Sequence, residues 1–337
     1  MFLYCQKLKL ASAMFAGLVA SLMATGVTAW DATGHRLTAY VAWEFMSEHS
    51  KERTLTILRS HPRFDRDFLN AMPDNVRATD MRQQDRWLFG QAAIWPDLAR
   101  SFSGADSRRY DHPEWHWVDG AWVRDEATRQ GNLYVNTEAF ADIEGIPAER
   151  VQRRSQAENV VTAIDLAVYE MSHARDPAEQ ALALSWFLHL TGDIHQPLHT
   201  GGLVSARMFS DGDRGGNGIR VRSGSTGSNL HAVWDGALRG PTLETSLRML
   251  MDIAGDIAAN KQLAEYAPTR WLQESRDYLL SSVYPDTVIS NVLRSENTGN
   301  QPGTITLSEA YEEQMRMIAA QRIAEAGVRI ANTLGNL

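Results

Sequence analysis

The sequence has a single cysteine among its 337 residues, Cys5. No disulfide can form within such a chain, so packing, with or without bound metal, must supply the stability that other proteins obtain from cross-links. The Asn-x-Ser/Thr acceptor motif for N-glycosylation is also absent. For an exported protein, this absence favours a bacterial source over a fungal or plant secretory route.

Positive charge is scarce as well. The chain has 33 lysine and arginine residues against 41 aspartate and glutamate residues. Residues 1–29 contribute Lys7 and Lys9, and without them the balance is 31 against 41, a net charge of −10. So acidic a protein repels nucleic acid unless something local reverses the sign of the field. Bound divalent cations would have that effect.

Long apolar segments are confined to the N-terminus. Residues 1–29 combine a basic start, an apolar and small-residue run at 10–24, and a Val-Thr-Ala sequence that ends at Ala29. This pattern predicts a secretory signal peptide at 1–29, followed by one domain at 30–337 in a secreted or periplasmic protein. A membrane anchor is the alternative. However, small residues interrupt the run, polar residues follow it, and no later segment approaches the ~20 apolar residues of a membrane span.

Apolar residues recur at helical spacing along most of the remaining chain. The clearest helix opens with Asp176 as its N-cap, Pro177 at the first position and Glu179 at the third, and we expect it to continue until Pro197 stops it. No repeat or linker divides the chain. The sequence therefore predicts an all-α fold in a single mainly helical domain. Further helical patterns cover residues 37–46, 157–172, 243–260, 271–283 and 308–334.

A glycine-rich segment at residues 210–229 is the main irregular part of the chain. It is consistent with a short hairpin around residues 218–222 or with an ordinary surface loop. Because it lies between motifs that contain histidine, we treat it as a hairpin or loop insertion beside a candidate site.

Two His–Asp pairs have the spacing of one helical turn. His189 and Asp193 are four positions apart on the helix described above, with His199 just beyond it, and His231 and Asp235 repeat the spacing. Imidazole nitrogen and carboxylate oxygen together suit a divalent metal such as zinc. Each pair alone is more typical of hydrogen-bonded or solvated residues on a helix face, so the argument depends on what accompanies them.

Other candidate residues lie upstream. Asp97 and Arg100 occur in the segment AAIWPDLAR, and His116 stands between two tryptophans, with Trp117 next and Asp119 shortly after. Alone, Asp97 is equally explained as a helix cap and His116 as a packed side chain. Neither motif identifies a site by itself.

The last motif opens the expected mature chain, where Trp30 is followed by His35. Five motifs follow one another along the chain: Trp-x4-His, Trp-x-Asp-x2-Arg, His-x2-Asp, His-x3-Asp-x5-His and His-x3-Asp. In this order they resemble the single-strand-specific zinc nucleases of fungi and plants and their bacterial relatives. These nucleases share a helical fold with zinc-dependent phospholipase C. The resemblance covers the whole mature chain, including WLQES at residues 271–275 and AGVRIANTL near the C-terminus. The sequence departs from the family in its missing cysteines and in longer spacings, where we expect insertions: residues 35–97, 116–189 and 199–231.

The resemblance implies three zinc ions per chain. The first ion would bind Asp97, His116, His189 and Asp193. The second would bind the α-amine and carbonyl of Trp30, together with His35 and the shared Asp193. The third would bind His199, His231 and Asp235. A set of only three protein ligands leaves positions open to water or substrate, as catalytic zinc requires.

The resemblance also implies an endonuclease and 3′-nucleotidase that hydrolyses single-stranded DNA and RNA to 5′-phosphorylated products. Asp97 and Asp193 would act through the zinc ions that lower the pKa of the attacking water, and Arg100 would neutralise charge on the phosphoryl oxygens. Asp119 would hydrogen-bond the terminal base, and Trp117 would either stack on that base or pack in the core. We expect a monomer with no membrane anchor once the signal is removed.

Two alternatives remain open at this point. A zinc-dependent phospholipase C or another phosphodiesterase would share the scaffold, although that branch has a longer gap between its terminal Trp and first His and a Glu at the position of Asp235. A non-catalytic, zinc-stabilised binding protein would need four closed protein ligands and no adjacent arginine. Five histidines have no place in the series, and of these we interpret His195 as a surface residue or one that supports the ligands: His49, His61, His112, His173 and His195.

Overall fold

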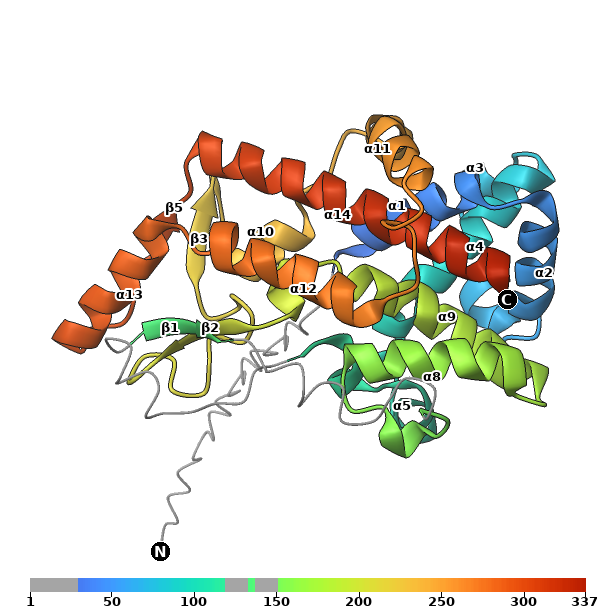
Figure 1. Ribbon diagram of the computed structural model, residues 1–337, viewed down its shortest axis with the longest axis horizontal. Helices are drawn as coiled ribbons and strands as arrows, with labels where there is room; N and C mark the ends of the chain where they lie inside the picture. Colours follow the sequence, from blue (N-terminus) through green and yellow to red (C-terminus); the bar gives the residue numbers. More distant parts are fainter. Residues whose placement is uncertain (1–29, 119–132, 137–150) are drawn as a thin grey trace, which may run out of the picture.

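The computed structural model describes residues 30–118, 133–136 and 151–337. The predicted signal peptide and Asp119 lie outside these ranges. Within them the chain is mainly helical, which confirms the predicted fold class (Figure 1). The α-helices are α1 (Ala32–Phe45), α2 (Glu48–Leu58), α3 (Asp74–Arg77), α4 (Met81–Ala99), α5 (Gly104–Tyr110), α8 (Val160–His173), α9 (Pro177–Asp193), α10 (Leu230–Asp235), α11 (Leu243–Ala259), α12 (Pro268–Tyr278), α13 (Asp286–Thr298) and α14 (Glu309–Asn336).

Shorter elements connect these helices. The π-helical turns are η1 (Phe64–Leu69) and η6 (Leu279–Val283), and the 3-10 turns are η2 (Pro113–His116), η4 (Arg154–Gln156) and η5 (Pro197–His199). The strands are β1 (Leu133–Asn136), β2 (Gly202–Ser205), β3 (Arg220–Ser223), β4 (Thr226–Asn229) and β5 (Ile305–Thr306). None of the described helices has the length and apolar content needed to cross a membrane.

Helix α1 lies at the centre of the packing, in contact with α4, α9, α11 and α14. One side of it, including Ala42 and Trp43, joins an apolar core with α2, α4, α8 and α9. Another side, including Leu37 and Val41, joins a second core with α10, α11 and α14. Complete burial of a leucine or valine side chain contributes about 1.5–3 kcal/mol, so both cores hold α1 in place. Its buried polar side chains are therefore presented to neighbouring helices in one fixed orientation.

The strands gather at one end of the molecule, while α14 runs across it with α8 and α9 below (Figure 1). Strand β1 pairs antiparallel with β2, and Tyr134 lies opposite Val204. In the other sheet, β3 pairs antiparallel with β4 and parallel with β5. The β3–β4 pair forms a hairpin within the glycine-rich segment, at residues 220–229 and not centred on 218–222. Its two-residue turn begins at Gly224, which adopts φ +54°, a conformation that glycine accepts without steric cost.

The predicted helices are present, with shifted ends. Asp176 caps α9 by accepting a hydrogen bond from the Ala178 backbone, as its sequence predicts. The helix ends at Asp193 rather than continuing to Pro197, so that part of the prediction is wrong. The backbone N–H groups of His195 and Gln196 bond three residues back, to Gly192 and Asp193, and Gln196 is extended because the residue before a proline is driven out of the helical region.

Candidate metal centre

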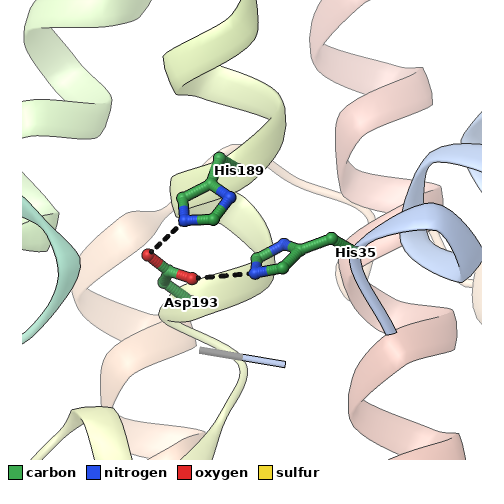
Figure 2. Close-up of side chains that lie close together, drawn as sticks. All are labelled: His35, His189 and Asp193. Carbon is green, nitrogen blue, oxygen red and sulfur yellow. Dashed lines mark ion pairs between the residues drawn. The ribbon is translucent and has the colours of Figure 1, made fainter. Parts of the chain in front are cut away.

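Asp193 lies at the C-terminal end of α9, and histidines from two helices converge on it. His189 is one turn earlier on the same helix, and its Nε2 atom lies 3.3 Å from Asp193 Oδ2. His35 projects from α1, with Nε2 3.3 Å from Asp193 Oδ1 (Figure 2). The two imidazole rings stack 4.0 Å apart. All three side chains are completely buried, so the carboxylate is presented to a dry interior.

His116 and Asp97 complete this part of the site. His116, at the end of η2, places Nδ1 2.9 Å from Asp193 Oδ2 and 3.1 Å from His189 Nε2. Asp97 lies in the last two turns of α4, where its Oδ1 atom is 3.8 Å from His189 Nε2. It is therefore inside a helix, which excludes the helix-cap interpretation. We call these five side chains the Asp193 group: His35, Asp97, His116, His189 and Asp193.

A second cluster, the Asp235 group, consists of His199, His231 and Asp235. His199 ends η5, whereas His231 and Asp235 are one turn apart on α10. His199 Nε2 lies 3.3 Å from His231 Nε2, which in turn lies 3.4 Å from Asp235 Oδ2. The side-chain donor atoms of this group, like those of His35–His189–Asp193 and of Asp97–His116–His189, are close enough to share one ion.

The hydrogen bonds around the Asp235 group determine its tautomers. His199 Nδ1 lies 2.7 Å from the His116 carbonyl oxygen, and His231 Nδ1 lies 2.6 Å from that of Gly215. A carbonyl can only accept, so both Nδ1 atoms carry the hydrogen and both Nε2 atoms direct lone pairs at each other. Burial holds the pKa of His199 well below its usual value, which disfavours the protonated ring near neutral pH. Two facing acceptors repel each other unless a cation lies between them, so these residues fit a metal ion.

The Asp193 group shows the same mismatch. His189 Nδ1 donates to the Ala93 carbonyl oxygen over 2.8 Å, which leaves the Nε2 lone pair facing two carboxylates and His116. Neither ring nitrogen of His35 has a hydrogen-bond partner among the residues that the structure describes. Buried polar atoms rarely remain unpaired, so this donor set also fits metal.

Burial sets the protonation of these groups when no cation is bound. It raises the pKa of Asp193 and of Asp235 well above the usual carboxyl value, because the charged forms are desolvated. For the same reason it lowers the pKa of His35 to about 4 and that of His116 well below its usual value. Positive charge would reverse the effect on the carboxyls, so metal binding and carboxylate ionisation are coupled.

Two glycines allow the ligands to approach. A Cβ atom at Gly192 would lie 2.7 Å from His35 Nδ1, so a larger residue there would displace the ring. Gly215 adopts φ +58°, and a Cβ atom there would lie 2.4 Å from the Leu198 carbonyl oxygen. Its own carbonyl orients His231. The glycine-rich segment is therefore part of the wall of the candidate site and not an ordinary surface loop.

Trp30 is completely buried in the core that contains α10 and α14. The next residue, Asp31, caps α1 through hydrogen bonds from the backbones of Thr33 and Gly34. Its own backbone N–H donates to the Asp235 carbonyl oxygen over 3.2 Å. The beginning of the expected mature chain is therefore fixed against α1, which carries His35, and α10, which carries His231 and Asp235.

Arg100 and Trp117 lie together at the edge of the Asp193 group. Arg100 Nη1 donates to Asp97 Oδ1 over 3.3 Å, and its guanidinium carbon lies 5.9 Å from the centre of the Trp117 ring. Trp117 is half-buried, so it is not a full member of the core. Asp119, the other expected substrate residue, lies outside the described residues.

Sequence reasoning missed Gln196. This completely buried side chain donates to Asp235 Oδ1 over 2.8 Å and accepts from the Leu198 backbone over 2.7 Å. Its position between Asp193 and His199 was the only signal available. The surface interpretation of His195 is wrong, because this residue has no exposed area. Burial and the nearby charges of Arg322 and Arg329 hold the pKa of His195 well below its usual value.

Comparison with known sequences extends these observations. A sequence model of the S1/P1 nuclease family matches residues 30–337. The chain is 23% identical to Endonuclease 3 of Arabidopsis thaliana over 339 aligned positions, covering 95% of this chain and 92% of that protein. It is 30% identical to Endonuclease 4 of the same plant, over 46% of this chain and 50% of that protein, so this match spans about half the length of the relative. It is 41% identical to Nuclease S1 of Aspergillus oryzae over 58 residues, 17% of each chain.

Fold and site define a mainly helical protein built around adjacent groups of histidine and aspartate side chains that could hold metal ions. The match over residues 30–337 makes the assignment specific. The chain belongs to the S1/P1 nuclease family.

Proposed function

We propose that this protein is a zinc-dependent nuclease that hydrolyses phosphodiester bonds of single-stranded DNA and RNA, leaves 5′-phosphorylated products, and also acts on 3′-nucleotides. The observation that carries the proposal is the pair of ligand groups, whose donor atoms lie close enough to share metal ions, in a chain that belongs to the S1/P1 nuclease family. Its relatives include plant proteins named as endonucleases and a fungal protein named Nuclease S1. Their names support the reaction class.

Three zinc ions are proposed for these groups. We assign one to Asp97, His116, His189 and Asp193, the second to the main-chain nitrogen and oxygen of Trp30 with His35 and Asp193, and the third to His199, His231 and Asp235. Asp193 suits a shared ligand because its two oxygens face different histidines, Oδ1 toward His35 and Oδ2 toward His116 and His189. Three divalent ions would change the net charge of the mature chain from −10 to −4, with the added positive charge concentrated at the site.

The ions, when bound, would lower the pKa of water and stabilise charge on phosphate oxygens. Arg100 would add a fixed positive charge next to the Asp193 group, where its contact with Asp97 holds the guanidinium close to the ligands. Asp97 thus has two tasks, metal binding and orientation of Arg100. The buried histidines exclude bulk water, which strengthens every charge interaction at the reacting phosphate.

Base recognition is assigned to Trp117 and Asp119. Trp117 is half-buried beside Arg100, so one part of its ring is held by the protein while the rest remains accessible. Stacking on an aromatic ring contributes about 1–3 kcal/mol per base and tolerates any base. We propose that Trp117 stacks on the base next to the cleaved phosphate and that Asp119 hydrogen-bonds it.

Removal of residues 1–29 is proposed as an activation step for this exported domain, which we propose acts as a monomer. The family match begins at Trp30, the residue after the proposed cleavage site. Trp30 is buried, and the next residue, Asp31, donates its backbone N–H to the Asp235 carbonyl oxygen. A free α-amine has a pKa of about 8 and can bind zinc near neutral pH, whereas an amide nitrogen has its lone pair delocalised into the peptide bond. Cleavage would therefore create two main-chain ligands at once.

The proposed function is tested by a zinc count on the purified mature protein, alongside hydrolysis of single-stranded oligonucleotides before and after chelation. We expect close to three zinc ions per chain and activity that chelation removes and zinc restores. Phosphatidylcholine at equal enzyme concentration is the comparison substrate, and preferential hydrolysis of that lipid would overturn the assignment. Zinc without hydrolysis of either substrate would favour a zinc-stabilised binding protein.

The proposed activation has its own experiment. A protein beginning at Trp30 is compared with one that retains the single extra residue Ala29 at its start. We expect the extended form to bind less zinc and to cleave more slowly, because its Trp30 nitrogen is an amide. Equal zinc content and equal cleavage would exclude ligation by the terminal amine.

A further inference from the structure

The segment between the two ligand groups is short and fully enclosed. Asp193 belongs to one group and His199 to the other, and only six positions separate them in the chain. The residues between them, including His195 and Gln196, are buried. Because the segment carries a ligand at each end, its conformation determines how the two groups are placed relative to each other.

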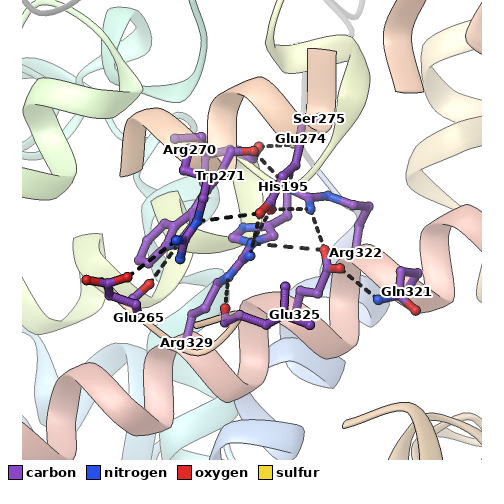
Figure 3. A network of polar contacts seen from close by, with 12 residues as sticks. His195, Glu265, Arg270, Trp271, Glu274, Ser275, Gln321, Arg322, Glu325 and Arg329 are labelled. Atoms are coloured by element: carbon purple, nitrogen blue, oxygen red, sulfur yellow. Dashed lines mark hydrogen bonds and ion pairs between the residues drawn. The ribbon is translucent and has the colours of Figure 1, made fainter. Parts of the chain in front are cut away.

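Side chains from α12 and α14 hold this segment. Ser275 of α12 donates to the Ile194 carbonyl oxygen over 2.6 Å. Arg329 of α14 contacts His195, with Nη1 2.6 Å from Nε2 (Figure 3). Arginine can only donate, so Nε2 accepts and His195 Nδ1 carries the hydrogen, which it donates to the Thr191 carbonyl oxygen over 2.6 Å. His195 is therefore a neutral ring that links α14 to the last turn of α9.

A buried ionic network fixes Arg329. Glu274 of α12 accepts from Arg329 Nη2 over 2.9 Å and from Arg322 Nη1 over 2.8 Å. Arg322 also donates to Ser275 Oγ over 2.9 Å and pairs with Glu325. Figure 3 shows these side chains meeting around His195, below α12 and above α14. Both arginines have no exposed area.

The energetics of such a network indicate its role. Buried ion pairs add little net stability compared with apolar residues of the same size, because desolvation offsets their attraction, but they fix geometry. Here the network contacts His195 through Arg329 and the Ile194 carbonyl oxygen through Ser275. Both His195 and Ile194 lie within the segment that joins the ligand groups. Glu274 and Ser275 belong to the sequence segment WLQES and Arg329 to AGVRIANTL, and the proposed chemistry assigns no role to either segment.

We infer that His195, Arg329 and Ser275 are positioning residues that set the relative placement of the Asp193 group and the Asp235 group. This inference rests on the proposed metal binding. Disruption of the network should weaken zinc binding through displaced ligands. A network that served only folding would lower the melting temperature without changing the affinity of the folded protein for zinc.

The test compares His195→Leu with His195→Gln. Leucine removes both hydrogen bonds of the ring, whereas the glutamine amide oxygen can still accept from Arg329. His61→Leu is the matched control, because His61 is also a buried histidine and accepts one hydrogen bond, from the Arg63 backbone over 3.2 Å, but lies outside the segment. Zinc affinity is measured by competition with a coloured chelator, and ligand geometry by the visible spectrum of the cobalt-substituted protein.

We expect His195→Leu to weaken zinc binding about 10- to 100-fold, the range for loss of a partner that orients metal ligands. His195→Gln should recover most of this loss, and His61→Leu should bind zinc like the wild type. Unchanged affinity and cobalt spectrum in His195→Leu would overturn the inference, as would an equal loss in His61→Leu.

A milder pair covers the case in which His195→Leu does not fold. Ser275→Ala removes the hydroxyl that holds Ile194, whereas Ser246→Ala removes a buried hydroxyl that donates to the Leu238 carbonyl oxygen over 3.2 Å, outside the segment. Only Ser275→Ala should weaken zinc binding, and equal affinities would count against the inference. Wild-type protein that binds zinc but cleaves no phosphodiester would reject the proposed function and leave these affinity comparisons valid.

Discussion

The two ligand groups are built from different kinds of structure. The Asp193 group takes four of its five side chains from the long helices α1, α4 and α9, whereas the Asp235 group sits on the short elements η5 and α10 beside a glycine-rich segment. In the Asp235 group each ligand has an outer hydrogen bond, meaning one to a protein group that does not itself bind metal. Asp235 accepts from the Gln196 side chain, and each histidine donates to a main-chain carbonyl oxygen. In the Asp193 group, among the described residues, His35 has no such hydrogen bond.

This difference teaches how each group obtains its geometry. Long helices with two apolar cores hold the Asp193 ligands in place even where, as at His35, no outer hydrogen bond is made among the described residues, and leave their charges to be balanced by metal. Short elements lack that support, so hydrogen bonds must orient each ligand of the Asp235 group. We expect the Asp193 group to depend more on bound ions, and the Asp235 group to depend more on its hydrogen-bond partners.

The largest effect is expected from Asp193→Asn. The neutral amide is a poor bridge between cations, so we expect two zinc ions to be lost and activity to fall by more than the ~1000-fold typical of losing one electrostatic donor. Glu296→Gln is the control, since Glu296 is a buried carboxylate that is not a ligand and accepts from the backbones of Arg207 and Met208. Metal analysis and single-strand cleavage are the measurements. A variant with three zinc ions and normal turnover would exclude the bridging role.

Arg100→Ala tests the charge beside the Asp193 group. We expect turnover to fall about 10- to 1000-fold with zinc content unchanged, because the variant removes a donor to the transition state and no ligand. Arg109→Ala removes an arginine that pairs with Glu179 at the surface and should have no effect on cleavage. Loss of zinc in Arg100→Ala would instead make Arg100 a support for Asp97.

Acidification should destabilise the metal-free protein through His35. In the metal-free protein burial lowers the pKa of His35 to about 4 from 6.5, so the unfolded chain binds its proton first as the pH falls. Neutral His35 therefore contributes fully to the free energy of unfolding above pH 6.5. This contribution is lost as the pH falls from 6.5 to about 4, and the free energy of unfolding decreases by about 3 kcal/mol.

Denaturant unfolding of the chelated and zinc-loaded proteins between these pH values measures the effect. His61, whose pKa burial lowers to about 3, titrates in both forms and cancels in the comparison. We expect His35→Gln to reduce the pH dependence of the chelated form by about 3 kcal/mol, while the buried His116 and His199 contribute a further part. An unchanged pH profile in that variant would show that His35 is not the group responsible.

Gln196→Leu addresses the other side of the comparison and should have the smallest effect. Asp235 would lose the partner that orients it, and we expect about 10- to 100-fold weaker binding of one zinc ion, with the other two retained. Gln91→Leu is the matched control, since Gln91 is also buried and its side-chain amide N–H donates to the Asp67 carbonyl oxygen. Equal loss of all three ions would mean that the two groups do not differ in their support.

Local spacing made part of the site predictable. A separation of four residues on a helix places two side chains on one face, which applied to His189 with Asp193 and to His231 with Asp235. The N-cap of α9 and the β3–β4 hairpin followed from equally local signals. The helix that carries Asp97 was not predicted, and Pro96 lies inside its last turn, where a proline usually marks a boundary.

The amino-acid sequence by itself determined the types of ligand, their helical pairing, the mainly helical fold and, through the order of its motifs, the family. Only the tertiary structure decided that His35 and His116 face Asp193 and that Asp97 lies beside His189. It also decided that Gln196 donates to Asp235 and that the buried His195 contacts Arg329. Those contacts join residues far apart in the chain. Spacing along a helix constrains neighbours within a turn or two, whereas distant residues meet only where the packing of both apolar cores brings their helices together.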